Sequence, residues 1–110
     1  MLRTLKFIID KQVLKQDPKC DFNDLVPGSE GFIQAEFSFS SDWDSYTKVV
    51  AFFSNLGEEY RPQILDKSLI CSIPIEALKR RIFKLQIIGK KDDTIIRTNK
   101  VAVEQIGGKV

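Results

Sequence analysis

The feature that most constrains this chain is an alternation of apolar and polar side chains over short segments that turn residues separate. The clearest segment is residues 33–40, where Ile33, Ala35 and Phe37 alternate with polar neighbours. A period of two is typical of a β-strand with one buried face and one wet face. The chain holds no long 3.6-residue pattern, which argues against repeated strand–helix–strand units. The pattern therefore predicts an all-β protein.

Further segments of this kind recur along the chain, with turn signals at intervals of roughly 8–12 residues. The predicted strands cover residues 5–9, 33–40, 46–55, 60–65, 69–73, 83–87, 94–98 and 100–106. Residues 46–55 are apolar on both faces, which indicates a central strand, whereas Pro62 marks residues 60–65 as an edge or irregular strand. Residues 16–24 are predicted as a loop, and residues 89–93 as a turn.

A single short helix is expected near residues 75–81. Pro74 suits the start of a helix, and the cations of residues 79–81 suit the negative end of its dipole. A helix between two strands resembles the connection between the fifth and sixth strands of immunoglobulin-like domains, although neither cysteine falls where antibody domains carry their disulfide. We expect an immunoglobulin-like β-sandwich of seven or eight short antiparallel strands.

Composition fits one folded domain. The chain has 110 residues, 43% of them hydrophobic, and a net charge of +2, which predicts a single domain over residues 1–106 and a flexible tail at 107–110. It lacks the run of about 20 apolar residues that a membrane span needs. Residues 1–4 also lack the apolar stretch of a signal peptide. We expect a protein made in the cytoplasm, without a membrane partner.

The residue types present exclude several kinds of chemistry. The chain has no histidine, which removes the commonest general base and the histidine-dependent triads. Cys20 and Cys71 form no zinc-binding pair. They are interpreted as buried free thiols, with a disulfide as the alternative, although no secretory context supports one. We expect no enzyme activity, no metal and no cofactor.

Charged residues are interpreted mainly as solvated surface. The pairs that lie in predicted turns are Asp42/Asp44, Glu58/Glu59 and Asp92/Asp93. A concentration of cations, which phosphates would attract, comprises Lys79, Arg80, Arg81, Lys84, Lys90 and Lys91. It lacks the aromatic side chains on which single-stranded nucleic acid stacks. We therefore expect no nucleic-acid partner.

Two aromatic residues are the candidate binding residues. Trp43 is the only tryptophan of the chain, and it lies in a polar turn beside Tyr46. Such a pair supplies a platform for sugar stacking or an anchor for a protein interface. The alternative places Trp43 over the open end of the core, just before the central strand.

The segment around Trp43 also carries a resemblance. An apolar strand, an acidic-Trp-acidic turn and a Lys-containing apolar strand follow one another over residues 37–52. This order is similar to small proteins of phages and prophages of low-GC Gram-positive bacteria. The similarity continues through residues 71–74, Leu78, Gly89 and residues 97–99, and it extends to the amino-terminal sandwich module of phage upper-baseplate proteins. It covers roughly residues 30–106.

The resemblance implies a structural role in a phage tail or baseplate, first in the bacterial cytoplasm and then in the virion. Such a protein acts by burying a sheet face or edge against copies of itself or against other tail proteins. The resemblance assigns no binding residue, so Trp43 and Tyr46 remain candidates from the residues alone. The alternative function is a carbohydrate-binding module that recognises a cell-wall or surface glycan.

Overall fold

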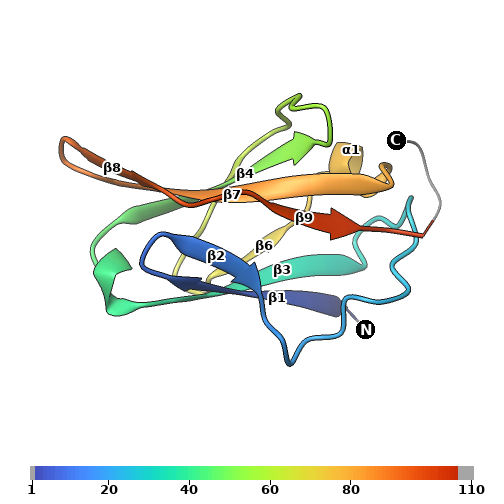
Figure 1. Cartoon of the computed structure of the whole chain (residues 1–110), viewed down its shortest axis with the longest axis horizontal. Helices are drawn as coiled ribbons and strands as arrows, with labels where there is room; N and C mark the ends of the chain where they lie inside the picture. Colours follow the sequence, from blue (N-terminus) through green and yellow to red (C-terminus); the bar gives the residue numbers. More distant parts are fainter. Residues whose placement is uncertain (1, 107–110) are drawn as a thin grey trace.

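The computed structural model describes residues 2–106 as two β-sheets packed face to face (Figure 1). Sheet A has the strand order β2-β1-β3-β6, and sheet B has the order β5-β4-β7-β8, with β9 also paired to β7. The strands described are β1 (Arg3–Asp10), β2 (Val13–Gln16), β3 (Ile33–Phe39), β4 (Thr47–Ser54), β5 (Gln63–Ile64), β6 (Ile70–Ser72), β7 (Ile82–Lys91), β8 (Thr94–Arg97) and β9 (Val101–Glu104). The prediction of an all-β sandwich is confirmed. The predicted tail at 107–110 lies outside the described residues.

The core lies between the two sheets and is built from alternate residues of each strand. In β7 every second side chain from Phe83 to Ile87 is buried, and in β1 the same holds from Leu5 to Ile9. The rings of Phe7 on β1 and Phe37 on β3 stack with centroids 5.4 Å apart. The period of two seen in the sequence therefore marks the face that each strand turns to the core.

The chain crosses between the sheets after β3, after β5 and after β6, in the Greek-key manner of immunoglobulin-like sandwiches. As predicted, β4 lies inside its sheet and β5 lies at an edge. Only Gln63 and Ile64 form β5, because Pro62 directly before them has no N–H with which to extend the ladder.

Two features of sheet A differ from the prediction. Strands β1 and β3 are parallel, with Leu5 opposite Ala35, so the strands are not all antiparallel. The chain returns through residues 17–32 to the end where β1 begins, and the Arg3 guanidinium donates to the Asp21 carbonyl of that connection over 3.1 Å. The described strands also number nine rather than seven or eight. The main addition is β2, which has four residues and one buried side chain, too short to show a period.

The helix is shorter than predicted. It spans α1 (Ile75–Leu78) and stops before residues 79–81, which were expected to continue it. The Gln105 side-chain amide donates to the carbonyls of Leu78 and Arg80, over 3.0 and 2.7 Å. The Gln105 N–H donates to the Arg81 carbonyl over 2.6 Å. These bonds keep residues 79–81 out of the helix and direct the chain into β7, which begins at residue 82.

Strand β7 runs through the segment that was predicted as a turn at 89–93, and only Asp92 and Asp93 turn the chain. Gly89 lies inside the strand because the Trp43 ring packs on its backbone. A Cβ at Gly89 would lie 2.6 Å from Cζ3 of Trp43. A glycine within a strand here marks the close approach of a side chain, not a bend.

Strands β8 and β9 share one edge of β7, and Thr98 and Asn99 lie in the break between them. The Asn99 side chain accepts a hydrogen bond from the Leu14 N–H (2.8 Å) and donates one to the Leu14 carbonyl (2.9 Å). The N–H and the carbonyl of Leu14 therefore both have a hydrogen-bond partner, as they would have if another strand paired with β2. The Asn99 amide thus joins β2 of sheet A to the edge of sheet B.

Candidate functional site

Trp43 closes one end of the core. It ends the 3-10 turn η1 (Ser41–Trp43), and its side chain is 0% exposed. Its indole N–H donates to the Lys11 carbonyl over 2.6 Å, and its ring packs against Phe39 with centroids 5.4 Å apart. The interpretation of Trp43 as a cap on the core agrees with this geometry. The ring has no exposed face on which a sugar could stack.

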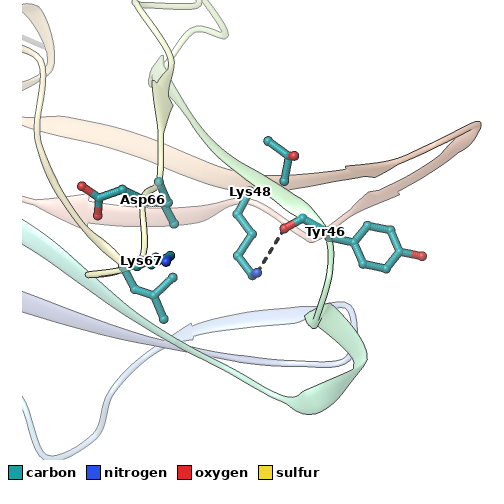
Figure 2. Close-up of a pocket in the computed structure, with 7 residues that line it drawn as sticks. Tyr46, Lys48, Asp66 and Lys67 are labelled. Carbon is teal, nitrogen blue, oxygen red and sulfur yellow. Dashed lines mark hydrogen bonds between the residues drawn. The ribbon is translucent and has the colours of Figure 1, made fainter.

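Tyr46 is the partly exposed member of the predicted pair. Its ring lies edge-on to Trp43 at a centroid distance of 6.3 Å, and the Lys91 ammonium lies 5.9 Å from its centroid. Figure 2 shows the ring pointing away from the neighbouring loop that carries Asp66 and Lys67. The structure therefore brings the two candidate aromatics into contact but gives only Tyr46 access to solvent.

A shallow hollow of about 470 Å³ lies beside Tyr46 (Figure 2). Its lining comprises Tyr46, Thr47, Lys48, Leu65, Asp66, Lys67 and Leu69. The Lys48 ammonium donates to the Tyr46 carbonyl over 3.1 Å and also lies 5.3 Å from the Phe39 ring centroid. Hydrogen bonds from the Ser68 hydroxyl and N–H lower the pKa of Asp66. Both charged side chains thus bond to backbone groups beside them.

The cations that the sequence groups together are separated in space. Lys79 and Arg81 lie just before β7, whereas Lys90 and Lys91 lie at its far end. Eight residues of β7 lie between Arg81 and Lys90, which places them about 30 Å apart at the usual rise per residue. They do not form one basic patch.

The predicted loop carboxylates are all exposed, and they are Asp42, Asp44, Glu58, Glu59, Asp92 and Asp93. Both cysteines are free, which agrees with the free-thiol interpretation. Cys71 is buried as expected, and burial raises its pKa to about 12, so it stays a protonated thiol at neutral pH. Cys20 is only half-buried, and its sulfur accepts a weak bond from the Lys6 N–H at 3.4 Å.

A second hollow, of about 400 Å³, lies beside α1. Its lining comprises Glu58, Tyr60, Glu76, Lys79 and Arg80. Tyr60 is 9% exposed, and its hydroxyl has no hydrogen-bond partner within residues 2–106. Sequence reasoning did not single out Tyr60, because an orphaned hydroxyl shows only in three dimensions.

We predict that Tyr60→Phe raises the free energy of unfolding by about 1 kcal/mol, because the change removes a buried, unpaired hydroxyl and keeps the ring. Urea unfolding of the two proteins measures the difference. A lower stability of the variant would contradict the prediction and would show that the hydroxyl has a partner in solution. Tyr46→Phe, at a half-exposed ring, is the matched control and should leave stability within about 0.5 kcal/mol.

Several segments that meet at the end of the sandwich where β1 begins and β9 ends (Figure 1) each carry an exposed apolar side chain. Three backbone hydrogen bonds bring this end together: from Arg3 to Phe32, from Gly28 to Leu78 and from Ile106 to Leu25. We call this group of side chains the apolar end, and it comprises Leu2, Val26, Phe32, Ile75 and Ile106. In the sequence these residues are scattered over more than a hundred positions, so only the fold reveals that their segments meet.

Within residues 2–106, no three or more cysteine and carboxylate side chains gather in a way that would hold a metal ion. No helix in this range is long and apolar enough to cross a membrane. Comparisons with protein-family models, with curated proteins and with solved structures found no match to this chain.

Proposed function

We propose that this protein is a non-enzymatic structural component of a phage tail or baseplate, and that it works by contact with other proteins. The observation that carries the proposal is the apolar end, where five large apolar side chains are exposed on segments that backbone hydrogen bonds bring together. Grouped apolar side chains on a soluble domain commonly mark a protein contact. The resemblance of residues 37–52 and of the segments after them supports the phage context.

The glycan-binding alternative receives less support. It relied on Trp43 and Tyr46 as a stacking platform, and the burial of Trp43 removes the larger of the two rings from solvent. Tyr46 alone presents a small, half-covered ring that packs against Trp43. A contact role needs neither ring to be free, so it is the function that the geometry supports best.

Mass spectrometry of gradient-banded phage particles, from an induced strain that carries the gene, tests the proposed function. We expect peptides of this protein at several copies per particle, because a structural component is incorporated in fixed number. Its absence from particles while it is abundant in the lysate would overturn the proposal.

A pair of variants then tests whether the apolar end makes the contact. Phe32→Ser together with Ile106→Ser should lower the copy number per particle, because both side chains are exposed and removing them weakens the contact more than the fold. Leu56→Ser is the matched control: its side chain is 87% exposed on the connection between β4 and β5. An unchanged copy number in the double variant would show that this surface is not the contact.

A further inference from the structure

Five strands lie at the borders of the two sheets, and their free edges differ. The edge of β2 is closed by Asn99, which occupies both peptide groups of Leu14. Strand β9 lies beside β2, and the Gln16 side chain donates to its Ala102 carbonyl over 3.1 Å. Strands β5 and β6 have two and three residues, with Pro62 directly before β5 and Pro74 two residues after β6. Strand β8 has four residues and no strand partner on its outer side within the described chain. The hairpin of β7 and β8 also extends past the rest of the sandwich (Figure 1).

The register fixes which peptide groups of β8 face outwards. The Thr98 N–H donates to the Ile87 carbonyl over 3.0 Å, in line with the pairing of β7 and β8. Because bonded pairs alternate along an antiparallel ladder, Ile96 bonds to β7 and the peptide groups of Ile95 and Arg97 point away from it. The Arg97 carbonyl agrees with this: it accepts a bond from the exposed Gln12 side chain at 3.2 Å, and pairing at this edge would replace that bond.

The backbone groups of β8 that are directed away from β7 are therefore centred on Ile95. This side chain is 51% exposed, on the outer face of sheet B. Arg97 and Asp93, two residues to either side, are exposed as well. An exposed edge strand with an apolar side chain at its centre is a template for pairing with another strand.

We propose that β8 pairs with β8 of a second copy of this chain, antiparallel about a two-fold axis at Ile95. In this register Ile95 lies opposite the partner subunit's Ile95. Arg97 then lies opposite the partner subunit's Asp93, and the symmetry forms this pair of opposite charges twice. Sheet B of one subunit and sheet B of its partner then form one continuous sheet. The inference rests on the proposed role in assembly and names a second copy as one partner.

The neighbouring registers fit poorly. A shift of two residues in one direction sets Arg97 opposite the partner subunit's Lys91, where like charges repel. A shift in the other direction sets Asp93 opposite the partner subunit's Asn99, whose side chain is already bonded to Leu14. A shift of a single residue would set outward peptide groups against groups that already bond to β7. Of the registers compared, the one centred on Ile95 is the one that sets opposite charges against each other.

Sedimentation equilibrium of the full chain over a wide concentration range, at low and high salt, tests the pairing. We expect a reversible monomer–dimer equilibrium that salt weakens, because exposed ion pairs are screened. Arg97→Asp and Asp93→Arg should each weaken the dimer by roughly tenfold or more, since each turns two attractive contacts into repulsive ones. The double variant, R97D with D93R, should restore the dimer. Glu30→Arg, an equal charge change at an exposed site away from β8, should have no effect.

Ile95→Pro provides an independent variant. It removes the outward N–H at the centre of the pairing and leaves the bonds from β8 to β7 in place, so it should abolish the dimer with an unchanged circular dichroism spectrum. A chain that stays monomeric at every concentration overturns the inference, as does a dimer that none of these variants alters. The proposed function is tested apart from this, because a monomeric protein found in phage particles would keep it, and a dimer absent from particles would not.

Discussion

Trp43→Ala should lower the free energy of unfolding by about 3–5 kcal/mol, the usual cost of truncating a large aromatic side chain in a core. The indole is completely buried, packs on the Gly89 backbone and donates to the Lys11 carbonyl. Its loss leaves a cavity at one end of the core and an unpaired carbonyl. Urea or thermal unfolding measures the effect.

Tyr46→Ala is the control for Trp43→Ala, because Tyr46 is half-exposed and in contact with the same indole. Tyr46→Ala should lower the free energy of unfolding clearly less, by about 1 kcal/mol. If Trp43→Ala left the melting temperature nearly unchanged, the core role would be wrong. If that variant also lost binding to a cell-wall glycan array, the stacking interpretation would replace it.

Gly89→Ala examines the same packing from the other side. The added methyl group would lie against the indole, which buried neighbours hold in place, so we expect a loss of about 1–3 kcal/mol from overpacking. The loss should largely vanish in the Trp43→Ala background, where the cavity admits the methyl group. Equal losses in both backgrounds would show that backbone effects dominate instead.

Asn99→Ala should lower the free energy of unfolding by about 1–2 kcal/mol, because it removes the partners of both the N–H and the carbonyl of Leu14 at a part-buried place. Asn99→Asp separates the two bonds: the carboxylate can still accept from the Leu14 N–H, but it cannot donate to the carbonyl. We expect Asn99→Asp to be destabilised as well, since a charge then faces that carbonyl. Chemical unfolding of the three proteins measures both effects.

Gln12→Ala is the matched control for the Asn99 variants. Its side chain also donates to a backbone carbonyl, that of Arg97, but in an exposed place where water can replace it. Its cost should stay below about 0.5 kcal/mol. An Asn99→Ala protein as stable as Gln12→Ala would mean that the two sheets are not joined through this amide.

The strands with one buried face were predictable because their pattern depends only on alternation. The alternation over residues 33–40 contains β3, which ends one residue earlier, and the apolar content of β4 on both faces indicated an inner strand. Features that depend on distant contacts were not predictable. Gly89 resembles a turn residue in sequence, and only the indole of Trp43 explains its place inside β7.

The same limit applies to the helix and to the candidate site. Residues 79–81 have good helical character, yet bonds to Gln105 draw them out of α1. The alternatives for Trp43 could be listed from its neighbours in sequence, but burial alone distinguishes a core cap from a platform. The apolar end and the free edge of β8 depend on which distant segments meet in the fold. A local sequence pattern does not contain that information.

The bonds between Asn99 and Leu14 also determine when, during synthesis, the edge of β2 can be closed. Strand β2 emerges from the ribosome before the amide that closes its edge, which belongs to a part of the chain 85 residues later. Until that part is made, the β1–β2 hairpin has an open edge, and β1 must also wait for β3 to pair in parallel. Folding therefore completes only after translation has passed residue 99, and a nascent chain that stalls before it exposes a strand edge prone to aggregation.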